Sequence, residues 1–273
     1  MGWITIGVVF VCFIVAVIFA KLTVKKPTER QGPFAVVLFL CFFLLITLSN
    51  QYALPEIKIW KEQRNLESSL QDIAVYQLIA KSDPDTYKRI TKEINKSLRN
   101  RESNEQIAVR IRRIINELVG KYLPRASDDA IFTYVSVMVQ EISELTQLNP
   151  ELAYEFLFPQ KGGAVRQSFQ LRPELQKADL DALAEVIRTG STNPHIVKDF
   201  SEAKLLLEKV IADLYKVYGN DLALLQNPLA PGIYKKKYCN MTVALFKEIF
   251  KMPRPQSCLV LRYMFSNIKN DSV

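Results

Sequence analysis

The chain has 273 residues, a net charge of +8 and only nine glycines. Its basic residues are interspersed with acidic ones, which argues against a nucleic-acid-binding protein, because such proteins concentrate Lys and Arg on one face. The length suffices for one large domain or two small ones, and the scarcity of glycine and of strand-like alternation favours an all-α fold.

Two apolar runs, at 2–20 and 33–48, carry no ionisable side chain. A helix needs about 17–25 apolar residues to cross a bilayer core, and the second run reaches that length when 49–54 extend it. Neither run has a polar face, so neither resembles an amphipathic helix of a soluble core. A cleaved signal peptide fits poorly, because no positive region precedes the first run. We therefore expect two membrane spans, at about 3–20 and 33–50.

The linker between the runs, 21–32, predicts the topology of this hairpin, which occupies 1–54. Loops rich in Lys and Arg stay in the cytoplasm, and both Trp3 and Tyr52 would then lie at the opposite interface. We expect 51–273 on the non-cytoplasmic side of the cytoplasmic membrane. The linker bases are Lys21, Lys25, Lys26 and Arg30. A second group of bases just past the second run weakens this bias: Lys58, Lys61 and Arg64.

The rest of the chain predicts an extramembrane multi-helix bundle in two parts, 55–158 and 174–273. Apolar residues at three- and four-residue spacing indicate helices in the first part over 53–80, 84–100, 104–123, 128–148 and 150–158. Three of these helices follow a side chain that can accept hydrogen bonds from the first turn, namely Asp83, Ser127 and Asn149.

A segment rich in glycine and proline, 159–173, interrupts the helical pattern and is the expected boundary between the two parts. A short β-hairpin over 164–171 is an alternative there. In the second part we expect a helix closed by Gly190, a helix that starts at Asn193 and Pro194, and two terminal helices. Their ranges are 179–190, 193–219, 240–251 and 256–266.

The residue types that carry catalysis do not form a recognisable pattern, so no catalytic, cofactor or metal site is predicted. His195 is the single histidine, and general-base chemistry needs a positioned partner. The sequence has no CxxC pair, no glycine-rich phosphate loop and no GxSxG elbow. Acidic residues occur on most of the predicted helices after residue 54, but a hydrolytic pair is defined by its separation in space.

Four cysteines are present. Cys12 and Cys41 lie inside the apolar runs, whereas Cys239 and Cys258 lie in the part expected outside the cytoplasm, where a disulfide could form. If the two terminal helices formed an antiparallel pair, Cys239 would lie about 14 Å beyond the residue opposite Cys258. A disulfide needs α-carbons within about 7 Å, so the sequence leaves both a bridge and two free thiols open.

One group of aromatic and basic residues resembles a recognition patch, because interfaces favour these residue types. It comprises Tyr234, Lys235, Lys236, Lys237, Tyr238 and Arg254. The alternative is an ordinary solvated run of lysines.

Together these patterns predict a non-enzymatic, membrane-anchored scaffold or interaction protein of the cell envelope. Its expected partners are the lipid bilayer and other envelope or membrane proteins. One alternative is an envelope hydrolase that acts on cell-wall polymers through carboxylates. Another inverts the topology, so that a cytoplasmic helical domain brings basic residues such as 234–238 to anionic lipid.

Overall fold

The structure is a computed structural model that describes residues 72–158, 171–228 and 234–266, together with scattered positions before residue 66. The chain divides into two compact units, Met1–Ser68 and Ser69–Val273. The predicted spans at 3–20 and 33–50 and the loop at 21–32 lie outside the described residues, apart from the scattered positions 11, 14–18, 45 and 47. In the described part of the chain, no helix has both the length and the apolar character that a bilayer crossing requires.

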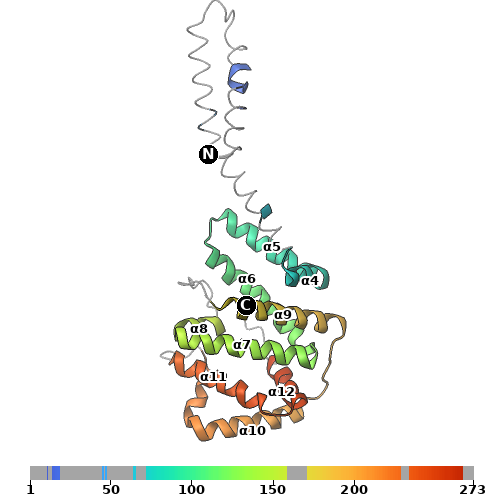
Figure 1. Cartoon of the computed structure of the whole chain (residues 1–273), viewed down its shortest axis with the longest axis vertical. Helices are drawn as coiled ribbons and strands as arrows, with labels where there is room; N and C mark the ends of the chain where they lie inside the picture. Colours follow the sequence, from blue (N-terminus) through green and yellow to red (C-terminus); the bar gives the residue numbers. More distant parts are fainter. Residues whose placement is uncertain are drawn as a thin grey trace, which may run out of the picture. The chain divides into compact units, whose positions relative to one another are not determined.

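The second unit is built from helices, and no described residue belongs to a strand, which confirms the all-α prediction (Figure 1). The α-helices are α4 (Ala74–Ser82), α5 (Pro84–Arg99), α6 (Asn104–Tyr122), α7 (Asp128–Leu148), α8 (Pro150–Leu157), α9 (Pro173–Thr192), α10 (Ser201–Tyr218), α11 (Lys235–Phe250) and α12 (Arg254–Ser266). Two 3₁₀ segments join them, η2 (Leu123–Arg125) and η3 (Gly219–Gln226). The predicted hairpin at 164–171 lies outside the described residues, except for Leu171.

The predicted helix starts at 84, 128 and 150 are confirmed by their caps. Each capping side chain accepts a hydrogen bond from a backbone N–H in the first turn: Asp83 from Thr86 at 3.1 Å, Ser127 from Ala130 at 3.3 Å, and Asn149 from Glu151 at 2.9 Å. These bonds satisfy amides that have no partner within the helix. Local sequence therefore determines where these helices begin.

The prediction that Gly190 closes a helix is wrong. Helix α9 starts at Pro173 and continues past Gly190 to Thr192. A Cβ at position 190 would lie 2.7 Å from the backbone carbonyl oxygen of Tyr122. The glycine therefore allows α9 to approach the end of α6 closely, and this packing role is not a turn signal.

The predicted helix over 193–219 begins late, at Ser201. The backbone N–H of His195 donates to the carbonyl oxygen of Arg125 at 2.8 Å, which ties this non-helical segment to η2. The predicted end is confirmed, because Gly219 adopts a φ of 53° after the last residue of α10. That conformation suits glycine, which lacks a Cβ.

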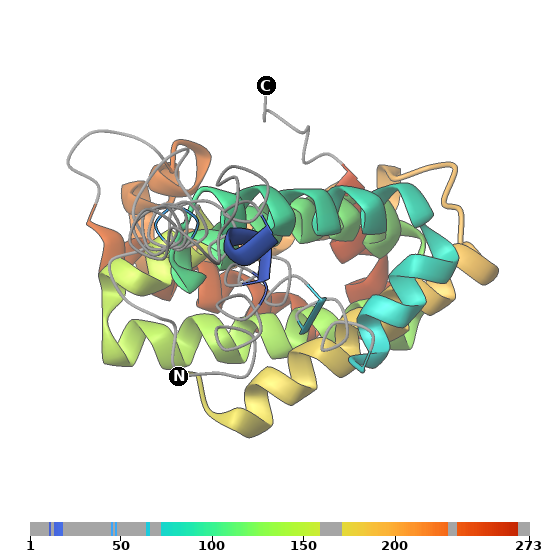
Figure 2. The same cartoon turned by 90° about the horizontal axis from the view of Figure 1, so that it is seen from above.

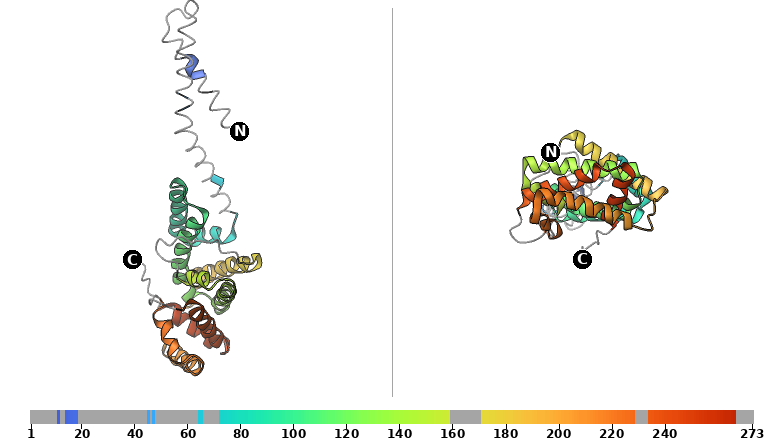
Figure 3. Two further views of the ribbon diagram at one scale, coloured as in Figure 1. Left: turned by 90° about the vertical axis from the view of Figure 1, so that its left-hand side faces the viewer. Right: turned by 90° about the horizontal axis from the view of Figure 1, so that it is seen from below.

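Helix α7 is the centre of the unit and packs against α8, α9, α11 and α12 (Figures 1 and 2). The described helices of the two predicted parts, 55–158 and 174–273, lie in the second unit, Ser69–Val273, whereas residues 55–68 belong to the first. Two helices lie at opposite ends of it, α5 at one end and α10 at the other (Figures 1 and 3). Because an end helix has neighbours on one side only, its other side is a surface.

Candidate functional surfaces

Helix α10 buries only a narrow stripe, formed by Ala203, Val210 and Leu214. Apolar side chains are also exposed elsewhere on α10, where Leu205 is 60% and Val217 is 74% exposed. Scattered apolar residues are normal at a protein surface, but a contiguous group of them indicates an interaction site.

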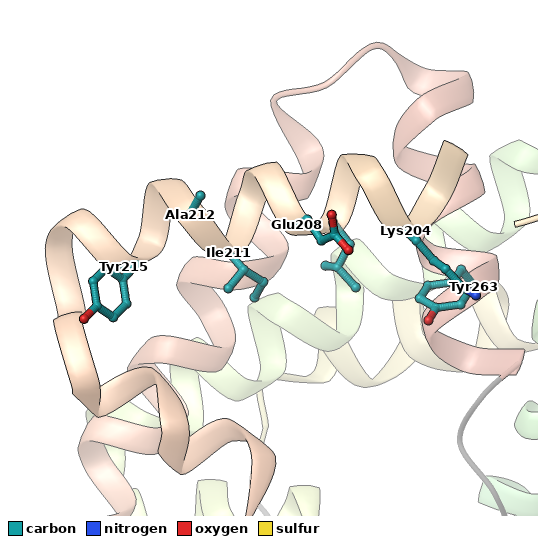
Figure 4. A pocket seen from close by; sticks show the side chains of 7 residues that line it. Lys204, Glu208, Ile211, Ala212, Tyr215 and Tyr263 are labelled. Carbon is teal, nitrogen blue, oxygen red and sulfur yellow. The ribbon is translucent and has the colours of Figure 1, made fainter. Parts of the chain in front are cut away.

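One flank of α10, beside α12, is hollowed into a groove of about 580 Å³. Its lining residues are Lys204, Leu207, Glu208, Ile211, Ala212 and Tyr215 of α10 and Tyr263 of α12. Figure 4 shows side chains along α10, with Tyr263 beside Lys204. The spacing of three and four residues places this row on one helical face. We call this surface the α10 groove.

The aromatic side chains of the α10 groove are held by neighbours. The hydroxyl of Tyr215 donates to Oδ1 of Asn220 at 3.1 Å. The ring of Tyr263 lies 5.7 Å from the ring of Phe200, and Nζ of Lys204 lies 5.9 Å from the Tyr263 ring centre. These contacts give the groove an apolar, aromatic floor with one cation and one carboxylate at its rim, which is the composition of a protein-binding surface.

The predicted recognition patch is divided by the structure. Tyr234 is exposed at the start of α11, but Tyr238 is buried, with its ring 5.7 Å from that of Tyr154. Lys235 forms an ion pair with Glu151, and Lys237 forms one with Asp221. Lys236 is exposed. Two of the three lysines therefore link α11 to neighbouring segments.

Arg254 does not join the residues at 234–238. It starts α12, beyond the whole length of α11, which is about 24 Å for 16 residues. Its guanidinium lies 3.7 Å above the ring of Phe132 and 2.9 Å from a carboxylate oxygen of Asp129. Arg254 therefore fastens α12 to the first turns of α7.

Cys239 and Cys258 are free and buried, so the bridge that the sequence left open does not form. The Cys239 thiol lies against the hydroxyl of Thr146, and Sγ of Cys258 lies 3.3 Å from the carbonyl oxygen of Asp128. Thr146 and Asp128 are near opposite ends of α7, about 27 Å apart at 1.5 Å per residue. The two thiols are thus far beyond the reach of a disulfide.

His195 lies near one acidic residue. Its Nδ1 lies 3.9 Å from Oδ1 of Asp128, the residue whose carbonyl oxygen contacts Cys258. Burial raises the pKa of the Cys258 thiol to about 11, and the thiol is fully buried. A nucleophilic cysteine needs an accessible thiolate, so this arrangement does not supply one.

The sequence did not predict a cluster of ionisable side chains between α6, α7 and α9, in which Glu141 is buried and the others are half-buried. It contains Arg112, Tyr134, Glu141 and Asp179, and the guanidinium of Arg112 lies 3.5 Å above the ring of Phe156. Burial, reinforced by the charge of Asp179, raises the pKa of Glu141 to about 8, while Arg112 opposes the shift. Burial also raises the pKa of Asp179. At neutral pH Glu141 is therefore mostly protonated.

A sequence signal for this cluster did exist. Glu141 lies four residues from both Val137 and Leu145, and all three are buried. A carboxyl inside an apolar helical period must either find a partner or hold its proton. The cluster lies between packed helices and away from the α10 groove, so we assign it to stability and its pH dependence.

Comparison with known proteins adds no further assignment, since no protein-family model, curated protein or solved structure matches this chain. Within the residues that the structure describes, no group of three or more His, Cys, Asp or Glu side chains is arranged to hold a metal ion. Any function must therefore be inferred from the surfaces described above.

Proposed function

We propose that this protein is a membrane-anchored, non-enzymatic interaction protein of the cell envelope, and that the α10 groove binds a partner protein. The observation that carries the proposal is the row of apolar and aromatic side chains along one exposed flank of an end helix. The anchor is supported by the sequence, in which 2–20 and 33–48 carry no ionisable side chain.

The shape of the α10 groove suits an amphipathic helix of another envelope or membrane protein. The row from Lys204 to Tyr215 spans about 16 Å, or three helical turns. Tyr215 and Tyr263 offer large, held aromatic surfaces, and such residues carry much of the energy in protein interfaces. A partner helix with apolar residues at three- and four-residue spacing would add one helix to the bundle and cover the exposed side of α10.

The proposed topology places 51–273 on the non-cytoplasmic side, because the linker at 21–32 is rich in Lys and Arg. A reporter that works only outside the cytoplasm, fused after Val273, should be active. Activity of a cytosol-specific reporter at the same position would reverse the topology, but it would leave the α10 groove and its partner open to test.

A hydrolase that acts through carboxylates is less well supported. Such enzymes place two carboxyl groups about 5–9.5 Å apart across a substrate cleft. The α10 groove contains one carboxylate, Glu208. The two neighbouring carboxyls of the ionisable cluster, Glu141 and Asp179, lie between packed helices.

The docking proposal can be tested by site-specific photo-crosslinking of the intact protein in its membrane. A photoreactive amino acid at position 211 should give a discrete adduct with another protein. The same amino acid at position 177 is the control, because Lys177 of α9 is exposed and remote from the groove. The adduct should disappear when Tyr215 is replaced by Asp. Identical adducts at positions 211 and 177 would refute docking at the α10 groove.

A further inference from the structure

Helix α5 carries a row of four cations on the side that faces away from the bundle. These residues are Lys88, Lys92, Lys96 and Arg99, and all four are exposed. The residues that α5 buries are Ile90, Ile94 and Ser97. Each cation is two residues from a buried one, which is about 200° around a helix with 3.6 residues per turn. The cations therefore lie opposite the packed side of α5, and we call them the α5 basic stripe.

Ion pairs with α6 neutralise the charges on the flanks of α5. The cations of the stripe, by contrast, outnumber the acids near them. Nη2 of Arg89 lies 2.7 Å from a carboxylate oxygen of Glu117, and Glu93 lies 3.9 Å from Arg110. The outward side contains one acid, Asp85, which is 3.9 Å from Lys88.

Within the described residues, the other three cations of the stripe, Lys92, Lys96 and Arg99, form no ion pair. The outward side of α5 therefore carries three more positive charges than negative ones. Figure 2 looks onto the end of the unit that bears α4 and α5. The excess positive charge lies on the exposed side of α5.

We propose that the α5 basic stripe binds the anionic phosphate headgroups of the bilayer that anchors the chain. The inference rests on the membrane anchoring proposed above, but not on the α10 groove or on which side of the bilayer the helical unit occupies. A cation near an anionic bilayer contributes about 1 kcal/mol, and this attraction falls off within a Debye length.

The linear arrangement of the stripe favours an extended surface over a small ligand. Lys88 and Arg99 are about 16 Å apart along the helix axis, so the four cations cannot converge on one phosphate. The stripe contains no aromatic residue on which a nucleic-acid base could stack. On a flat anionic surface, each cation of such a row can interact with a different headgroup.

The sequence distance from the anchor also favours lipid. Lys88 follows the end of the second apolar run, Leu48, by 40 residues. The covalent link to the proposed anchor keeps the stripe at high effective concentration near the bilayer, so that a weak electrostatic attraction suffices. On this proposal the end of the unit with α5 meets the lipid, and the α10 groove at the opposite end remains accessible to a partner (Figure 3).

The test measures lysine acylation in the intact protein, reconstituted in vesicles of phosphatidylcholine with or without phosphatidylglycerol. A surface potential of about −30 mV raises the local proton concentration about three-fold, so the reactive free amine of a bound lysine falls by about the same factor. Mass spectrometry should therefore show about three-fold slower acylation of Lys92 and Lys96 in the anionic vesicles. Lys209 and Lys236, which are exposed elsewhere, are the internal controls and should not change.

High salt should restore the acylation of Lys92 and Lys96, because it screens the surface charge. Equal acylation rates of Lys92 and Lys96 in both kinds of vesicle would overturn the proposal. Slower acylation that appears only when a soluble polyanion is added to phosphatidylcholine vesicles would also overturn it. A protein that fails to float with the vesicles would refute the anchor itself. A protein that floats but shows no slowing would refute only lipid binding by the stripe.

Discussion

The guanidinium of Arg262 donates a hydrogen bond to the carboxylate of Asp128, joining a fully buried side chain of α12 to the first residue of α7. The same guanidinium donates to the carbonyl oxygens of Pro124 at 3.1 Å and of Ala126 at 2.6 Å. One buried cation therefore satisfies three acceptors around the junction of η2 and α7.

Replacing Arg262 with Ala should destabilise the protein by about 3 kcal/mol. The substitution leaves buried carbonyl oxygens without a donor and opens a cavity, and each effect is costly. The measurement is urea unfolding of the intact protein in detergent, followed by circular dichroism. Arg188→Gln is the control, because Arg188 and Glu185 form an exposed pair of small value. Equal midpoints for both variants would contradict the anchoring role of Arg262.

Glu141 should make the stability of the fold fall as the pH rises. Its pKa is about 8 in the folded protein and near 4.5 when the side chain is free in water. The folded state therefore holds a proton that the unfolded state releases, and this contribution is lost as the pH rises from 4.5 through about 8. Glu141→Gln should remove that part of the slope.

At a pH just above 8, Glu141→Gln should be more stable than the wild type by about 5 kcal/mol, since the pKa rises from 4.5 to about 8 on folding and each pKa unit corresponds to about 1.4 kcal/mol. Near pH 4 the two proteins should differ little. The measurement is the urea midpoint across this range, with the exposed Glu185→Gln as a control. Parallel pH profiles for Glu141→Gln and the wild type would show that Glu141 ionises normally in the folded state.

Two glycines within α-helices should respond in opposite directions to alanine. Gly190→Ala places a Cβ 2.7 Å from the carbonyl oxygen of Tyr122, so we expect a loss of about 1–3 kcal/mol from strain. Gly120→Ala meets nothing within 4 Å and should gain about 0.5–1 kcal/mol, because alanine is the better helix former. Thermal unfolding of both variants checks this pair. A gain in both would show that α6 and α9 do not approach closely at Gly190.

Local chemistry made several helix boundaries predictable from the sequence. A capping side chain and the helix it starts are within a few residues of each other, as Asp83 is with Thr86. The same reasoning was wrong at Gly190 and Asn193, because distant segments decide the structure there: Tyr122 contacts the glycine, and Arg125 holds the backbone next to Asn193.

The fate of the predicted recognition patch could not be read from the sequence, because it depends on which charged residues meet in the folded protein. The lysines at 235 and 237 looked like a recognition patch, but Glu151, 84 residues away, and Asp221 pair with them. Lys92, Lys96 and Arg99 of α5 have no such partners among the described residues. Only the three-dimensional arrangement separates a paired lysine run from an unpaired one.

The thiols of Cys239 and Cys258 should be unreactive in the folded protein and reactive once it unfolds. Burial raises the pKa of both to about 11, two units above the ordinary value, so the thiolate fraction falls about 100-fold. Maleimide labelling of the intact protein, read by mass spectrometry of its peptides, should mark neither residue until urea is added. Asn240→Cys is the matched control, because position 240 is adjacent to Cys239 and exposed, and it should label at once. Recovery of a peptide in which Cys239 and Cys258 are linked, from protein that was never reduced, would overturn the placement of the two thiols near opposite ends of α7.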